Sequence, residues 1–429
     1  MFYITHKNAH RQALAAVFSL VLGLCPFSAA HAETETTAHS QRGLAATLQA
    51  VMQYNPSVKG KQAEINAQGF AVDSAKAGRY PSLSAQANNL AEDGNRGSLR
   101  VQQPLWAFGK IDSRIDEAKA EFKAEQWALL QVQRQLIEEA SATYAQIEGI
   151  NQRREIAKQN IAEHEALYQR IERRFNGKLA SKADVNLAYS RLVQARTSLQ
   201  RIQGEWLVAL SDLQALTQIV VPSDTPVPSG LAELPALAVV QDLAVENSAD
   251  MAFKNQRLAV AKQTARREKN SPLPTVYFRV EQDFLDTPTG VDDTRVGLAI
   301  ESSLEGLGFA ALGRARGASA RQDAARQDLS QTRVETKRRI KSLMLNRQVQ
   351  NNLVSSQTEA LAAVESTMES FLRQYKSGRK TWVEVLNTQR ELTSVRLQLA
   401  QIKSDWLVLS LRIAAVIGHL DQLAGIEKP

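Results

Sequence analysis

The sequence contains two related halves, and this duplication constrains the fold more than any other feature. At an offset of 200 residues, Asp184 aligns with Glu384, and Glu205-Trp206-Leu207-Val208 aligns with Asp405-Trp406-Leu407-Val408. The tryptophan match is informative because the chain contains only five tryptophans. Earlier parts of the halves align at slightly different offsets, as loops that tolerate insertions would produce. We therefore expect two copies of one structural unit.

Proline-free stretches with coiled-coil spacing predict unusually long helices. From Ile111 to Asn176 there is no proline and one glycine, Gly149, and apolar residues recur every three, four or seven positions. A continuous helix of about 65 residues would be on the order of 100 Å long. The second half is free of proline from residue 289 to residue 428. Each half is therefore expected to form a long helical hairpin, at about residues 110–218 and 312–418.

Each half also carries a candidate β-hairpin with alternating apolar and polar residues. The two hairpins are expected at about residues 82–105 and 275–303, with turns at Glu92–Gly97 and Asp286–Asp293. Each strand is near the ~9–11 residues that cross a membrane as β-structure. Four strands cannot close a barrel, since ~8 is the usual minimum, and open sheet edges are not tolerated in lipid. Several chains must therefore share one barrel.

The N-terminus is typical of an export signal. Lys7 and Arg11 precede an apolar stretch from Ala13 to Leu24, and Ala30-His31-Ala32 supplies small residues for cleavage. About 12 apolar residues are short of the ~20 that span a bilayer, which disfavours the alternative of a retained anchor. Cys25 is the single cysteine. A lipidated cysteine normally follows a small residue, and Leu24 precedes Cys25, which disfavours lipidation.

These features give the expected organisation of the chain. It comprises a signal peptide at 1–32, a first repeat at 33–220, a linker at 221–235, a second repeat at 236–420 and a short tail at 421–429. The expected fold class is mainly α with a small β part.

Composition excludes several classes of function. Removal of Lys7 and Arg11 with the signal lowers the net charge from +7 to +5, and the charges are interspersed, so no nucleic-acid partner is expected. Mean hydropathy is −0.30, without a stretch for a transmembrane helix in the mature chain. The mature chain has no cysteine and only three scattered histidines, His39, His164 and His419. No catalysis, metal or cofactor is therefore expected.

Three stretches of the first half resemble, in order and spacing, signatures of the TolC family of outer-membrane channels: Asn55-Pro56-Ser57, Ala77-Gly-Arg-Tyr-Pro-Ser-Leu-Ser84 and Gln103-Pro-Leu-Trp-Ala-Phe-Gly-Lys110. The resemblance extends from about residue 44 to about residue 418. It implies a homotrimer whose protomers each give four strands to a twelve-stranded barrel in outer-membrane lipid and a duplicated hairpin to a periplasmic tunnel. Its implied partners are a periplasmic adaptor (membrane fusion) protein and an inner-membrane ABC or other pump.

The resemblance also implies roles for particular residues. Trp106 and Phe108 fit an aromatic belt at the membrane interface. The hairpin tips would form a periplasmic gate, held shut by contacts between neighbouring hairpins, in which Asp184 bonds Tyr375 and Lys380 bonds backbone near Ala183. The tips equally fit ordinary turns, because both use glycine and then restart a helix with an acid in its first turn. Glu384 and Asn387 align with the family's two rings of pore-lining acids. The second ring is neutral here, because Asn387 stands in place of an acid.

The expected function is passive conduction from a pump complex to the exterior, with type I protein secretion, of an adhesin for example, as the favoured process. Small-molecule efflux is the close alternative. A periplasmic adaptor or a structural coiled-coil protein is a third reading, which the duplication and the amphipathic strands disfavour.

Overall fold

The computed structural model describes residues 43–88, 96–223, 225–285, 293–303 and 305–427. The predicted signal peptide, with Cys25, lies outside the described residues, as do most of the two turns predicted within the β-hairpins. The helices are α2 (Leu44–Tyr54), α3 (Pro56–Ala77), α4 (Lys110–Asn176), α5 (Lys182–Thr217), α6 (Leu237–Asn247), α7 (Ala249–Asn270), α8 (Phe309–Lys376), α9 (Trp382–Val416) and α10 (Asp421–Ala424), with the 3-10 helices η1 (Ser229–Ala232) and η2 (Glu305–Gly308). The strands are β1 (Ser82–Asn88), β2 (Arg96–Trp106), β3 (Thr275–Leu285) and β4 (Asp293–Glu301).

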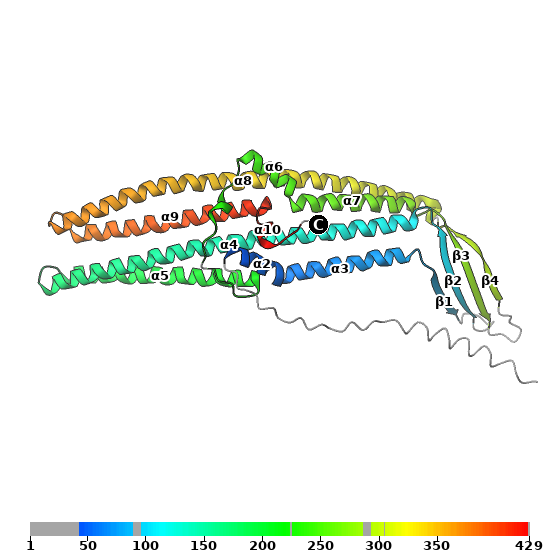
Figure 1. The fold of residues 1–429 in the computed structure, drawn as a ribbon, viewed down its shortest axis with the longest axis horizontal. Helices are drawn as coiled ribbons and strands as arrows, with labels where there is room; N and C mark the ends of the chain where they lie inside the picture. The colour runs from blue at the N-terminus through cyan, green and yellow to red at the C-terminus, as the bar shows by residue number, and fades with distance from the viewer. Residues whose placement is uncertain (1–42, 89–95, 224, 286–292, 304, 428–429) are drawn as a thin grey trace, which may run out of the picture. The chain divides into compact units, whose positions relative to one another are not determined.

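The predicted fold class, mainly α with a small β part, is confirmed. Two long helices dominate the fold, α4 with 67 residues and α8 with 68. At 1.5 Å per residue each extends about 100 Å. Each long helix turns back into a shorter one, α5 or α9, so that two helical hairpins lie side by side (Figure 1). No helix within the described ranges is long and apolar enough to cross a membrane.

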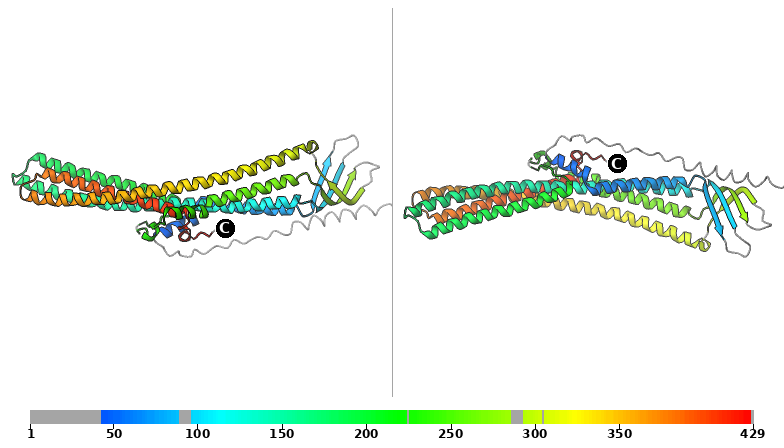
Figure 2. Two further views of the ribbon diagram at one scale, coloured as in Figure 1. Left: turned by 90° about the horizontal axis from the view of Figure 1, so that it is seen from above. Right: turned by 90° about the horizontal axis from the view of Figure 1, so that it is seen from below.

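The two repeats pack against each other through the long helices. Helix α4 contacts α5 of its own repeat and also α9 and α7 of the second repeat, while α8 contacts α9 and α7 (Figure 2). The largest buried cluster lies where α4 meets α2, α5 and α9, and its fully buried side chains include Tyr144, Ile147, Ile150 and Leu411. The hydrophobic seam of α4 is therefore covered by both halves of the chain.

A single glycine permits the close approach of α4 and α9. A Cβ atom added to Gly149 would lie 2.1 Å from Oγ and 2.3 Å from Cβ of Ser404. Real Cβ atoms do not approach other heavy atoms so closely, because van der Waals contact is near 3.5–4.0 Å. Gly149, the only glycine within α4, is therefore required where α9 crosses it.

The four strands form one antiparallel sheet in the order β1-β2-β3-β4. Pairs β1–β2 and β3–β4 lie within repeats, and β2–β3 joins the two repeats. The β2–β3 register shifts between Pro104 and Trp106. Pro104 has no N–H to donate, so a bulge is a position where a sheet tolerates it.

The sheet has one apolar and one polar face. Residues opposite one another in register share a face, and one such row consists of Leu83, Val101, Val280 and Val296. On the other face Arg100 and Glu281 form an ion pair of 2.6 Å, and Arg279 pairs with Glu301. The apolar face is open in the single chain, since Leu298 and Ile300 are more than 70% exposed.

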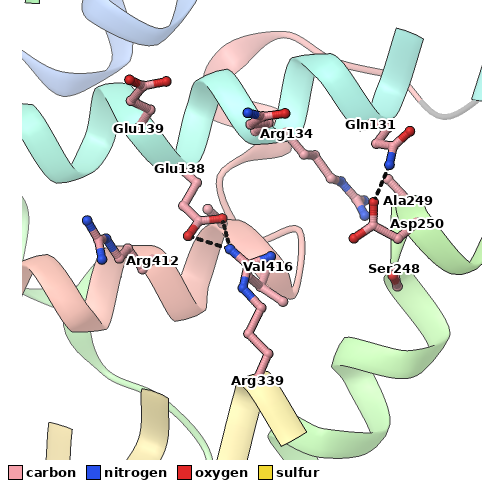
Figure 3. Close-up of a pocket in the computed structure, with 12 residues that line it drawn as sticks. Gln131, Arg134, Glu138, Glu139, Ser248, Ala249, Asp250, Arg339, Arg412 and Val416 are labelled. Atoms are coloured by element: carbon pink, nitrogen blue, oxygen red, sulfur yellow. Dashed lines mark hydrogen bonds and ion pairs between the residues drawn. The ribbon is translucent and has the colours of Figure 1, made fainter. Parts of the chain in front are cut away.

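A buried ion pair holds the C-terminal segment against α4. The guanidinium of Arg134 lies 2.6 Å from the carboxylate of Asp421 at the start of α10, and it also donates to the carbonyl of Asn247 at the end of α6. Arg134 lies beside a cavity of about 490 Å³ where α9 ends and α7 begins (Figure 3). Across that cavity Arg339 of α8 pairs with Glu138 of α4 at 2.6 Å.

Candidate functional site

The candidate site consists of the two hairpin tips, where α4 turns into α5 and α8 turns into α9. At the first tip Lys178 has φ +57°, and the N–H of Leu179 donates to the carbonyl of Arg174 at 2.8 Å. The chain thereby closes α4 with a left-handed residue, as helix C-termini commonly do. Ser181 then begins α5 through a capping box with Asp184.

The second tip repeats this geometry at the same offset of 200 residues. Gly378 has φ +74°, and the N–H of Arg379 donates to the carbonyl of Gln374 at 2.9 Å. Thr381 caps α9 and forms a capping box with Glu384. In both boxes the acid accepts from the backbone N–H of the cap residue, at 3.0 Å. The acids therefore satisfy N–H groups that would otherwise have no partner at the helix start.

Two contacts join the tips to each other. The indole Nε1 of Trp382 donates to Oδ1 of Asp184 at 2.8 Å. The guanidinium of Arg174 donates to the hydroxyl of Tyr375 at 3.0 Å and lies 5.6 Å from the centre of its ring. Each contact links one hairpin to the other, so the tips are connected by side chains.

Lys380 bonds within its own helix start. Its Nζ lies 2.7 Å from Oε1 of Glu384 and 4.3 Å from the ring centre of Phe371. The predicted gate residues are therefore brought to one place, but with different partners inside the chain: Asp184 bonds Trp382 and Ser181, and Tyr375 bonds Arg174. The bonds expected between neighbouring hairpins of an assembly, from Asp184 to Tyr375 and from Lys380 to backbone near Ala183, stay predictions.

The acids of the tips are held in their charged form. The hydrogen bond from Trp382, followed by those from Ser181, lowers the pKa of Asp184. Lys380, followed by the N–H and hydroxyl of Thr381, lowers the pKa of Glu384 to about 2. Hydrogen bonds to a carboxylate favour its ionised form, which is the cause in both cases.

The remaining predicted residues are accessible. Ala183 is exposed beside Asp184, and Asn387 is exposed one turn after the half-buried Glu384. Residues three apart lie on neighbouring positions of a helix surface, so Glu384 and Asn387 share a side of α9.

The two predicted interface aromatics lie at the junction of the sheet and the helices. Trp106 ends β2 and Phe108 precedes α4, with their rings edge to face at 6.0 Å between centroids. Both are more than half exposed in the single chain.

Sequence reasoning missed Trp382 and Arg174 as the residues that join the tips. Trp382 is one of five tryptophans and follows a helix cap, which was the available signal. Arg174 carried none, because it lies in a helix rich in arginine. Among the residues that the structure describes, no group of three or more acids, histidines or cysteines could hold a metal ion.

Comparison with known proteins places these features in a family. The model of the outer membrane efflux protein family matches residues 47–217 and 240–419. Among solved structures, the outer-membrane channel OprN aligns with a TM-score of 0.72 at 19% identity, over 87% of this chain and 89% of its own. The outer membrane protein VceC of Vibrio cholerae aligns with a TM-score of 0.72 at 18% identity, over 87% of this chain and 96% of its own.

CusC is a third similar structure, with a TM-score of 0.75 at 16% identity over 89% of this chain and 95% of its own. At such identities the likeness concerns the fold. A search of curated protein sequences finds no significant match.

Proposed function

Because the chain belongs to the outer membrane efflux protein family, we propose that it is one protomer of a trimeric outer-membrane channel. The channel conducts substrate passively, and an inner-membrane pump and a periplasmic adaptor supply energy and cargo. The favoured process is type I protein secretion, with a large adhesin as one possible cargo. This preference rests on the resemblance to the TolC family described above.

The observation that carries the proposal is the two-faced sheet. Its apolar face is open in the single chain, while its other face carries ion pairs such as Arg100–Glu281. A lipid-facing sheet needs an apolar side and must leave no backbone group unpaired. Strands β1 and β4 are the two edges of the sheet. Further copies of the chain would pair with both edges and close a barrel of twelve strands.

The internal repeat supports association of copies along the helices as well. Within the chain α4 packs against α9, and Leu407 and Val408 of α9 pack against the buried cluster. Their repeat equivalents on α5, Leu207 and Val208, are 61% and 62% exposed. The equivalent contact would set α8 of another copy against α5, and it would cover these side chains.

We assign the closed state of this channel to the hairpin tips. Contacts between neighbouring hairpins, with Asp184, Tyr375 and Lys380 as participants, would hold the tunnel shut. Docking of the adaptor would separate the tips, while Glu384 and Asn387 would line the pore. Trp106 and Phe108 would lie at the periplasmic border of the membrane.

Disulfide cross-linking tests the shared barrel. Cys25 lies in the predicted signal peptide, so introduced cysteines are free of background in the mature chain. Pairs that combine Ser84→Cys or Gln86→Cys in β1 with Gly297→Cys or Ala299→Cys in β4 should give covalent trimers in outer membranes. The matched control replaces the β1 cysteine by Ser98→Cys in β2, which is paired on both sides. A water-soluble monomer without cross-links would overturn the proposal and favour an adaptor or a structural coiled-coil protein.

Small-molecule efflux is the second candidate, and the description of the matched family favours it. Deletion of the gene separates the two, when the secreted proteome is compared with sensitivity to toxic small molecules. Loss of a secreted protein supports type I secretion. Intact secretion with raised sensitivity supports efflux.

A further inference from the structure

A buried histidine lies in the first hairpin, below its tip. His164 of α4 is 4% exposed, and Nδ1 of its ring has no hydrogen-bond partner among the described residues. It precedes the last residue of α4, Asn176, by 12 positions, which is about 18 Å along a helix. One turn earlier, the buried Asn160 accepts a hydrogen bond of 2.7 Å from Thr393 of α9. His164 therefore belongs to a buried polar layer between α4 and its neighbours.

The second repeat has an apolar residue at the equivalent position. At the offset of 200 residues His164 corresponds to Val364 of α8. Val364 packs against a cluster that includes Met368 and Leu392. A buried valine has no polar atom that requires a hydrogen bond. A buried imidazole without a partner leaves a polar atom unsatisfied, which is unfavourable. The first hairpin thus carries a titratable group at a position where the second hairpin accommodates an apolar side chain.

The charges around His164 favour its neutral form. Arg191 of α5 acts on the imidazole, and after burial it is the second cause that lowers the pKa of His164. The neighbouring acids of α4 are already paired, Glu163 with Arg396 of α9 at 3.6 Å and Glu165 with Arg196 of α5 at 3.7 Å.

The neighbouring helices offer no further carboxylate to an imidazolium among the described contacts. From α9, Gln389 donates to Glu163. From α8, Glu365 pairs with Arg396 at 2.9 Å. A proton on His164 would therefore be buried within the electrostatic influence of Arg191, without a free counter-charge.

We propose that His164 is a proton-sensitive switch that loosens the first hairpin, below the tip contacts, when the surrounding solution becomes acidic. The neutral ring lets α4 pack against α5 and α9. The charged ring gains water and moves away from Arg191 only when these helices separate. The proposal rests on the channel function proposed above, because a loosened hairpin matters through the opening of the tunnel.

The direction of the pH effect follows from the protonation states. The packed hairpin has a histidine pKa below the usual value of 6.5, and a loosened hairpin returns toward that value. The loosened state therefore binds more protons. Packing loses stability as pH falls through 6.5, and the loss is complete below the lowered pKa. The acids of the tips, Asp184 and Glu384, stay ionised over this range because their own pKa values are lowered.

Hydrogen exchange on the purified, detergent-solubilised protein tests the switch. After correction for intrinsic rates, residues 155–176 should exchange several-fold faster at pH about 5.5 than at pH about 7.5, in the range where a histidine titrates. Residues 355–376 of the second hairpin serve as the internal control and should not change. In His164→Val, which introduces the residue found at the equivalent position of the second repeat, the acceleration should disappear. His164→Gln should behave in the same way, and His419→Gln should keep the response of the unmodified protein.

Single-channel conductance provides the second readout. Acidification should raise the open probability of the unmodified channel, and either variant at His164 should abolish that rise. An unchanged pH response in both variants, or an equal response of the two hairpins, would overturn the switch while leaving the channel function intact. Absence of any conductance would defeat the channel function, whereas the exchange measurement would still decide whether His164 controls the first hairpin.

Discussion

The indole of Trp382 donates a hydrogen bond of 2.8 Å to the carboxylate of Asp184 and so joins the tips of the two helical hairpins. The same carboxylate accepts from Ser181 and caps the start of α5. Asp184 therefore fixes both the start of its own helix and the position of the neighbouring hairpin. The repeat-related Glu384 has a different second partner, Lys380, in its own hairpin. The two equivalent capping acids thus differ in their second partner: Asp184 contacts the other hairpin, and Glu384 contacts its own.

Removal of the donor on Trp382 should weaken the connection between the tips. In Trp382→Phe the ring is kept and the hydrogen bond is lost, so we expect a several-fold higher open probability in planar bilayers, with unchanged helix content by circular dichroism. The double variant Tyr375→Phe with Asp184→Ala should raise conductance further. Trp127→Phe, on α4 and far from the tip, is the control. If Trp382→Phe has the same open probability as the control, Trp382 is an ordinary turn residue.

The capping acids should make the tips sensitive to strong acid and insensitive to mild acid. Because the pKa of Glu384 is lowered to about 2, its stabilising effect is complete above the usual 4.5 and is lost as pH falls through the lowered value. The same sign holds for Asp184, whose pKa is also lowered. In a His164→Gln background, hydrogen exchange at residues 374–384, after correction for intrinsic rates, should stay constant from neutral pH to the usual pKa of Glu384. Over this range Glu384→Gln should exchange faster than the parent protein, and equal corrected exchange in the two proteins would contradict this assignment.

The crossing of α4 and α9 should not tolerate a methyl group. Gly149→Ala places a Cβ against Ser404, and overpacking of this kind costs about 1–3 kcal/mol of unfolding free energy. Ser404→Gly should restore part of that loss. Gly204→Ala on α5 is the matched control, since an added Cβ there has no neighbour within 4 Å. It should be neutral or stabilise by about 0.5–1 kcal/mol, because alanine is favoured over glycine in a helix. Thermal unfolding in detergent measures all three, and equal melting of the two alanine variants would show that the helices separate freely here.

The buried pair of Arg134 and Asp421 should be sensitive to loss of one partner only. Asp421→Asn leaves the arginine charge without its counter-charge, and we expect a loss of about 3–5 kcal/mol. The double variant Arg134→Met with Asp421→Leu removes both charges and should lose much less. The exposed pair of Lys76 and Asp73 is the control, because such pairs contribute about 0–1 kcal/mol. If single variants of the buried and the exposed pair lose similar amounts of unfolding free energy, the C-terminal segment lies outside the cooperatively unfolding core.

The sequence predicted the helical part of the fold because its signals are local. Heptad spacing and the lack of proline between Ile111 and Asn176 are properties of one segment, and α4 spans that segment. Acids in the first turn of α5 and α9 also act locally, and the structure shows Asp184 and Glu384 in capping boxes. The alternation of strand residues is equally local, and the paired register separates an apolar from a polar face.

By itself, then, the sequence determined the elements, their duplication and the family, since periodicity, caps and repeats depend on residues near one another in the chain. The tertiary structure alone decided which side chains meet across elements: Trp382 with Asp184, Gly149 with Ser404, and His164 within a buried polar layer. The reason is geometric. A helix position fixes the direction of a side chain, but its partner depends on the distance and offset between two helices, and these are set by packing over the whole length of both.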